Sequence, residues 1–311
     1  MLIDLLLIVL GTVLIVWGAD RLTEGAVAIA AKMHIPEIII GLTIVAFGTS
    51  APEFAVSLSS ALKGTADMAV GNIVGSNIFN TMFIIGVAAL VLPIATTRAM
   101  VKKDIPFAIV ASIILLALCA YDRELSRWDA LILLVVLCIF MYNTIRAAKA
   151  GKLDEQAAEV HTMATWKAIA WFIVGLGCLV FGSNLFVDSA SSIARTLGLS
   201  DAIIGLTIVA GGTSLPELAT SVVAARKGNS AIAIGNVVGS NVLNILLILG
   251  LTGIISPMAN LQLLPLDYGL MLLSIVLLWL FSHTKFRIER WEGLLLIVLY
   301  IAYVAFLISN V

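Results

Sequence analysis

Ten long apolar runs dominate this sequence of 311 residues and limit what it can fold into. A helix crosses the hydrocarbon core of a membrane with about 20 apolar residues. No run shows the strict alternation of a membrane strand. The sequence therefore predicts an all-α polytopic membrane protein with ten transmembrane helices. The runs lie near 3–19, 36–61, 68–93, 105–120, 128–146, 166–187, 201–225, 230–256, 263–282 and 291–309.

The composition excludes several classes of protein. Hydrophobic residues make up 61% of the chain and charged residues 12%, whereas soluble domains have about 45–50% and about 25%. A water-soluble enzyme is therefore excluded. A net charge of −1 gives no basic surface for nucleic acid. We expect the lipid bilayer as a partner and no nucleic acid.

The basic residues predict an orientation. With ten spans, the 18 Lys and Arg residues divide 14 to 4 between the two sides, the four being Lys63, Arg123, Arg127 and Arg195. The positive-inside rule then places both termini outside the cytoplasm. The polar stretch 146–165 becomes a cytoplasmic linker between residues 1–145 and 166–311.

The chain contains an internal repeat with an offset of 164 residues. Residues 39–50 read IIGLTIVAFGTS and residues 203–214 read IIGLTIVAGGTS. Across positions 39 to 86, 28 of 48 residues are identical at this offset, including Gly, Thr, Ser, Pro, Glu and Asn. Five spans per half is an odd number, so the second half enters the membrane in the opposite sense. Two inverted five-helix repeats, with broken helices 2 and 7 at the centre, are typical of secondary transporters, although some channels share the arrangement.

Two glutamates, Glu53 and Glu217, lie mid-span at matching positions of the repeat. A charge inside the membrane is costly and marks a functional site by default. Two such carboxylates facing each other across a pseudo-two-fold axis would repel, and a divalent cation between them removes that penalty.

The neighbouring residues favour a hard cation. Pro52 and Pro216 interrupt their helices and free backbone carbonyls, chiefly those of Gly48 and Gly212. Hydroxyl oxygens come from a set of four residues: Thr49, Ser50, Thr213 and Ser214. Calcium takes about 6–8 oxygens in flexible geometry, and the same oxygens suit sodium. The alternative interpretation is that Glu simply stabilises the N-terminus of a broken helix.

A second pair of segments spans Gly71–Asn80 and Gly235–Asn244. Their Gly-x-x-x-Gly pattern, at Gly71, Gly75, Gly235 and Gly239, is typical of close helix packing. Ser76 and Asn80 share one helix face, as do Ser240 and Asn244, and we place these faces against the two glutamates. The remaining amides, Asn72, Asn77, Asn236 and Asn241, need hydrogen bonds or a ligand at this depth.

Other chemistries find little support. The three histidines are scattered in loops and no thiolate cluster exists, which disfavours a transition metal. A serine nucleophile at Ser50 or Ser214 would lack a base in the neighbouring spans. We therefore expect neither an enzyme nor a bound cofactor.

These paired segments closely resemble the two alpha repeats of the sodium/calcium exchangers, in the cation/calcium exchanger superfamily. The compact size resembles that of the prokaryotic members. The resemblance implies a Na⁺/Ca²⁺ antiporter of the prokaryotic inner (plasma) membrane that works by alternating access. We expect a monomer. It also implies a fixed core of spans two, three, seven and eight, with spans one and six as the moving gate.

The resemblance further implies roles for single residues. Glu53 and Glu217 match the central calcium ligands that sodium shares, and Asn80 matches an asparagine of the central site. Asn244 stands where several prokaryotic and potassium-dependent members have aspartate, so two formal negative charges remain for one Ca²⁺. Backbone or hydroxyl oxygen for calcium or sodium is implied at Thr49 and Thr213, backbone carbonyls for sodium at Ala46 and Ala210, and flanking sodium ligands at Ser50, Ser76, Ser214 and Ser240.

Two rival functions remain open from the sequence. A calcium/proton exchanger could use the same two carboxylates to carry protons. A cation channel would conduct one ion with no requirement for a counter-ion.

Overall fold

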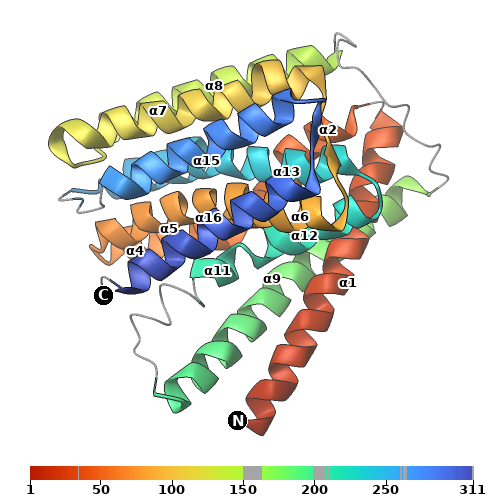
Figure 1. Ribbon diagram of the computed structural model, residues 1–311, viewed down its shortest axis with the longest axis horizontal. Coiled ribbons are helices and arrows are strands. Elements are labelled where there is room, and N and C mark those ends of the chain that lie inside the picture. Colours follow the sequence, from red (N-terminus) through yellow and green to blue (C-terminus); the bar gives the residue numbers. More distant parts are fainter. Residues whose placement is uncertain are drawn as a thin grey trace.

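The computed structural model describes residues 1–33, 35–149, 163–198, 208, 210–259, 261 and 265–309 (Figure 1). These residues are mostly helical, as predicted. Two short strands, β1 (Ile94–Ala95) and β2 (Arg287–Ile288), pair antiparallel and were not predicted. Each strand has only two residues and lies in a connection between helices, so the sequence shows no alternating pattern that would predict it.

The first half of the chain contains twelve elements, in which η denotes a π-helical turn. They are α1 (Leu2–Met33), α2 (Glu37–Ile40), η1 (Gly41–Val45), α3 (Ala46–Thr49), α4 (Ala51–Leu62), α5 (Ala66–Ile78), η2 (Phe79–Ile84), α6 (Ile85–Val91), β1, η3 (Met100–Asp104), α7 (Ile105–Asp122) and α8 (Arg127–Lys149).

The second half repeats the order of the main helices where it is described, but its strand lies between the last two helices, whereas β1 precedes η3 and α7. Its elements are α9 (Thr165–Thr196), α11 (Ala210–Thr213), α12 (Leu215–Arg226), α13 (Ser230–Leu243), η5 (Asn244–Leu249), α14 (Gly250–Ile255), α15 (Pro265–His283), β2 and α16 (Arg290–Ser309). The helices α11 and α12 begin and end 164 residues after α3 and α4, so the sequence repeat is also a structural one.

Seven helices in the described part of the chain are long and apolar enough to cross a membrane. An eighth span results if Glu37–Thr49 and Ala51–Leu62, which meet at a bend of 47°, are counted together. Most of the predicted linker, and the first part of the predicted span 201–225, lie outside the described residues.

The predicted first span, 3–19, is too short, because α1 continues to Met33. The charged residues just after position 19 are paired on the helix itself. Arg21 donates hydrogen bonds to Asp20 at 2.5 Å and to Glu24 at 2.7 Å. An ion pair between residues three apart, as between Arg21 and Glu24, is compatible with a continuous helix, so composition alone placed the boundary too early.

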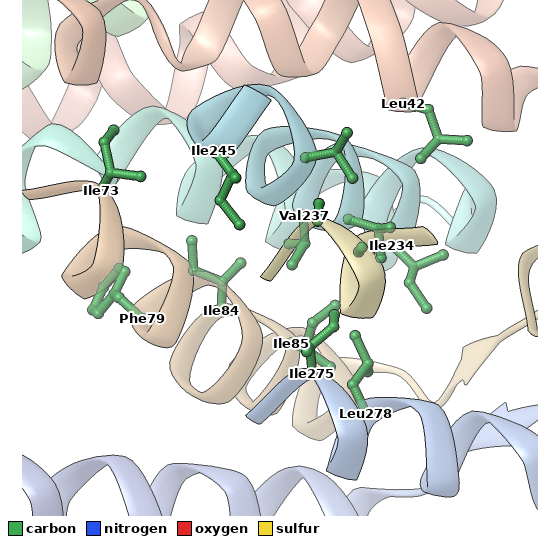
Figure 2. Packing of buried hydrophobic residues seen from close by; sticks show 14 of the residues in the cluster. Leu42, Ile73, Phe79, Ile84, Ile85, Ile234, Val237, Ile245, Ile275 and Leu278 are labelled. Carbon is green, nitrogen blue, oxygen red and sulfur yellow. The ribbon is translucent and has the colours of Figure 1, made fainter. Parts of the chain in front are cut away.

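The centre of the molecule is formed by α5 with η2 and by α13 with η5. The spans Ala66–Val91 and Ser230–Ile255 are far more buried than the others. Figure 2 shows how Ile234 and Val237 of α13 lie among apolar side chains from several other elements. These two spans carry the Ser and Asn segments, so the polar residues of the repeat lie inside the protein and away from lipid.

The Gly-x-x-x-Gly prediction holds for the second copy. A Cβ on Gly235 would lie 3.1 Å from the carbonyl oxygen of Ile38, and one on Gly239 would lie 2.5 Å from that of Leu42. Backbones approach this closely only where a side chain is missing. For Gly75, no described atom lies within 4 Å of the same position. The positions equivalent to Ile38 and Leu42, 202 and 206, lie outside the described residues, so the prediction for the first copy is not tested.

The long helices α1 and α9 form an antiparallel pair at one side of the molecule (Figure 1). Glycines face the partner backbone at intervals of seven residues: Gly11 meets Gly182, Gly18 meets Gly175, and Gly25 meets Ala168. One ion pair ties this unit to the core, because Lys227 at the end of α12 lies 2.6 Å from Asp20 of α1.

Candidate cation site

Glu53 and Glu217 lie where two broken helices begin again. Each is the third residue of its helix, α4 or α12, and a proline precedes it in the first turn. Proline is well tolerated there because the first N–H groups of a helix have no intrahelical partner. A carboxylate in this turn is also stabilised by the helix dipole. The helix-start interpretation therefore holds, and it does not exclude a ligand role.

Both glutamates are buried, with 0% of their surface exposed. Each accepts a hydrogen bond from a serine of the opposite half. Ser50 Oγ donates to Glu217 Oε1 at 2.8 Å, and Ser214 Oγ donates to Glu53 Oε1 at 2.8 Å. These two bonds, related by the repeat, bring the two helix breaks together at one site.

Further hydroxyls surround the same carboxylates. Ser240 Oγ lies 3.1 Å from Ser50 Oγ and 3.4 Å from Glu217 Oε1. Thr49 interacts with Glu217, and Thr213 interacts with Glu53. The predicted site residues Thr49, Ser50, Thr213, Ser214 and Ser240 are thus gathered around the two glutamates.

Two asparagines that the sequence left without a role hold the backbone of the site. Asn72 Nδ2 donates to the carbonyl oxygen of Glu53 at 3.3 Å and to Ser57 Oγ at 3.0 Å. Asn236 Nδ2 makes the equivalent bonds to Glu217 at 3.4 Å and to Ser221 Oγ at 3.0 Å. The identity of Ser57 with Ser221 in the repeat was the available signal for this support.

Asn80 and Asn244 lie in the π-helical turns η2 and η5. Such turns interrupt α-helices rarely, and they occur frequently at functional sites. Both residues are completely buried. Their side-chain nitrogens donate hydrogen bonds across the repeat, Asn80 to Asn241 and Asn244 to Asn77.

Four buried oxygens of this site have no hydrogen-bond partner among the described residues. They form two pairs related by the repeat: Glu53 Oε2 with Glu217 Oε2, and Asn80 Oδ1 with Asn244 Oδ1. Ser76 Oγ is likewise without a partner, whereas its repeat mate Ser240 is bonded. Buried polar atoms are almost always satisfied, so a matched set of unsatisfied oxygens indicates a place for a cation.

The backbone carbonyls are less available than the prolines suggested. The carbonyl of Ala46 accepts from the backbone N–H of Ser50 at 3.0 Å and faces Thr49 Oγ1 at 3.4 Å. The carbonyl of Gly48 accepts a backbone N–H at the helix end, so it is not freed as predicted. The tight turn at Ser50 re-forms these bonds locally. Ala210 begins α11, and its side chain lies outside what the structure describes.

The electrostatics of the site call for a positive charge. The two carboxylates are close enough to repel each other, and among the described residues no Lys or Arg forms an ion pair with either. A cation bound between them would remove the repulsion. The described residues also contain no group of three or more His, Cys, Asp or Glu suited to a metal. The polar groups gathered here are carboxylate, amide and hydroxyl oxygens, the donor types that suit a hard cation.

Fold and site together define a multi-pass membrane protein of the cation-transporter class. The sequence profile described as "Sodium/calcium exchanger protein" matches residues 3–146 and 167–309. The chain belongs to this family.

Relatives match over the full length of the chain. The putative antiporter CaxA of Alkalimonas amylolytica is 38% identical, covering 100% of both chains. The sodium/calcium exchanger MaX1 of Methanosarcina acetivorans is 34% identical, covering 98% of each. Among solved structures, the sodium-calcium exchanger NCX_Mj superimposes with a TM-score of 0.86 at 29% identity, over 98% of this chain and 99% of that one. The predicted resemblance to prokaryotic sodium/calcium exchangers is confirmed.

Proposed function

We propose that the protein is a secondary active antiporter that exchanges Na⁺ for Ca²⁺ by alternating access, with both ions using the site between Glu53 and Glu217. The observation that carries the proposal is the set of four unpartnered oxygens on these glutamates and on Asn80 and Asn244. Membership of the sodium/calcium exchanger family and the similarity to the sodium/calcium exchangers MaX1 and NCX_Mj support it.

The ligand count supports calcium. Two carboxylates and two amide oxygens, with hydroxyls of Ser and Thr around them, supply about the 6–8 oxygens that Ca²⁺ takes. The two formal negative charges balance one Ca²⁺. We propose the remaining site residues, Ala46, Ala210, Thr49, Thr213, Ser50, Ser214, Ser76 and Ser240, as ligands that complete the sites for Na⁺ or Ca²⁺.

The architecture supports alternating access through an inverted repeat. The helices match at an offset of 164 residues, and α1 runs antiparallel to its repeat mate α9. The α1–α9 pair lies outside the buried core, and a moving gate would also have to lie outside that core. We accordingly propose ten spans in the inner (plasma) membrane, with both termini outside the cytoplasm.

Reconstituted transport tests this function and separates it from its rivals. Purified protein in vesicles should take up radioactive calcium when a Na⁺ gradient is imposed. Uptake driven only by a proton gradient would establish the calcium/proton exchanger instead. A K⁺ gradient tests potassium co-transport, and flux that needs no counter-ion would establish a channel.

Substitution of the glutamates should abolish uptake. Glu53→Gln or Glu217→Gln removes one of the two charges that hold Ca²⁺, so we expect Na⁺-driven uptake to fall to background. Glu292→Gln is the matched control, because Glu292 is also buried but lies outside the site. The Glu292→Gln variant should show normal Na⁺-driven uptake when the rate is expressed per amount of folded protein. Uptake that survives in either site variant would refute the assignment.

A further inference from the structure

Two chains of hydrogen bonds lead away from the amides of the proposed cation site. In the first, Asn80 Nδ2 donates to Asn241 Oδ1 at 3.2 Å. Asn241 Nδ2 then donates to Thr81 Oγ1 at 2.7 Å, and Thr81 Oγ1 donates to the backbone carbonyl of Asn77 at 2.8 Å. All four residues are buried.

The second chain of bonds starts from the other amide. Asn244 Nδ2 donates to Asn77 Oδ1 at 3.0 Å, and Asn77 Nδ2 donates to the backbone carbonyl of Asn241 at 3.2 Å. Both chains therefore end on a backbone carbonyl.

The backbone carbonyl at the end of each chain fixes the direction of every other hydrogen bond in that chain. A carbonyl can only accept, so the Thr81 hydroxyl must donate to it and is left to accept from Asn241. Asn241 then offers its oxygen to Asn80, so Asn80 must present its nitrogen. The same logic runs from the carbonyl of Asn241 through Asn77 to Asn244. In both cases the amide oxygen at the end of the chain turns away from the bond, and both of these oxygens are unpartnered.

We propose that Thr81, Asn77 and Asn241 are positioning residues that aim the amide oxygens of Asn80 and Asn244 at the transported cation. This inference rests on the proposed function. A side-chain amide held the other way would point its N–H₂ group at the cation and repel it. The positioning residues thus set the affinity of the site for Ca²⁺ and not the rate of the conformational change.

One member of this network differs between the two halves, so its effect on one amide can be tested separately from the other. Thr81 matches Ile245 in the second half, so only the first chain passes through a side-chain hydroxyl. The second ends directly on the backbone. Loss of the Thr81 hydroxyl should therefore release Asn80 and leave Asn244 in place.

The test compares Thr81→Val, which removes the hydroxyl, with Thr81→Ser, which keeps it. Losing a group that orients a metal ligand typically costs 10–100-fold in affinity. We expect Thr81→Val to raise the Ca²⁺ concentration for half-maximal uptake by about tenfold or more, with little change in the maximal rate. Equilibrium binding of radioactive calcium to the purified protein should weaken equally. Thr81→Ser should behave as the unaltered protein. If Thr81→Val does not yield folded protein, Thr81→Ala carries the same comparison.

Double variants decide whether Thr81 acts through Asn80. In an Asn80→Ala background, Thr81→Val should produce no further loss of affinity, because its target is gone. In an Asn244→Ala background it should keep its full effect. Equal affinities for Thr81→Val and Thr81→Ser, or additive losses with Asn80→Ala, would overturn the positioning role. If Glu53→Gln also bound calcium normally, the cation site itself would be refuted. If only the Thr81 comparison failed, that site would stand.

Discussion

At the scale of single residues, the site is distinguished by which buried oxygens are left without partners. Glu53, Glu217 and Glu292 are all buried glutamates. Glu292 has both oxygens bonded, to Thr284 Oγ1 at 3.3 Å and to the backbone N–H of Glu289 at 2.7 Å, and it caps a helix. Glu53 and Glu217 each keep one oxygen unbonded. What separates the two site glutamates from Glu292 is a pair of unbonded carboxylate oxygens at matching positions of the repeat.

Protons should compete with calcium at these carboxylates. On the proposed function, Ca²⁺ binds the two glutamates in their deprotonated form, so lowering the pH removes the binding form and should weaken binding. We expect the Ca²⁺ concentration for half-maximal uptake to rise steadily from neutral to mildly acid pH, while saturating Ca²⁺ restores the rate. Uptake at limiting and saturating calcium across this range measures the effect. A half-saturation constant independent of pH would contradict it.

At the scale of elements, helix interruptions recur in the same places in both halves. The breaks at Ser50 and Ser214 and the π-helical turns η2 and η5 put each ligand segment at an interruption of its span. Proline predicts the helix breaks from the sequence, whereas no local sequence signal predicts a π-helical turn. The π-helical turns are therefore features that only the tertiary structure revealed.

The antiparallel contact of α1 with α9 should depend on its glycines. A Cβ on Gly18 would lie 2.7 Å from the carbonyl oxygen of Gly175, and one on Gly175 would lie 2.5 Å from the backbone nitrogen of Leu22. We expect Gly18→Ala or Gly175→Ala to force the helices apart and destabilise the protein by about 1–3 kcal/mol. The melting temperature of the purified protein measures this.

Gly177→Ala is the matched control for that experiment. Gly177 lies on the same helix, α9, but no described atom lies within 4 Å of its added Cβ. Alanine is the better helix former by up to about 1 kcal/mol, so the melting temperature should hold or rise slightly. Equal behaviour of Gly175→Ala and Gly177→Ala would show that the close contact is not needed.

At the scale of the whole molecule, the two halves are alike but not equivalent. The helix α1 packs on α12 and is tied to it by Asp20 and Lys227. In the repeat, these positions correspond to Asn184 and Lys63, which cannot form an ion pair. Because the Asp20–Lys227 pair is about a third exposed, it contributes at most about 1 kcal/mol. The α1–α9 unit therefore has an attachment on one side of the core that the other side lacks.

The orientation of the molecule follows from the distribution of Lys and Arg and can be measured directly. With 14 of 18 basic residues on the side of the linker, residues 146–165 should be cytoplasmic. We expect a protease to cut this segment in inside-out membrane vesicles and to leave it intact in right-side-out vesicles. An epitope at either terminus should show the opposite pattern. Cleavage of the linker from the outside would reverse the assignment.

The sequence was sufficient for the helical membrane class, the paired halves and the buried position of the two glutamates. Apolar length predicted membrane-spanning helices, the offset of 164 predicted the paired halves, and two charged residues in apolar spans singled out Glu53 and Glu217. It placed the end of α1 too early and expected an open carbonyl at Gly48, because local pairing at Arg21 and Ser50 leaves no trace in composition.

Contacts between residues far apart in the chain required the tertiary structure. Ser50 reaches Glu217 across 167 positions, and Asn80 reaches Asn241 across 161. The repeat shows which residues are equivalent, but hydrogen-bond direction depends on where each chain of bonds ends. The oxygens that remain for a cation are those that no donor can reach once the two halves have packed together. Which oxygens stay unbonded is a property of the folded molecule, because each half supplies hydrogen-bond donors to the other.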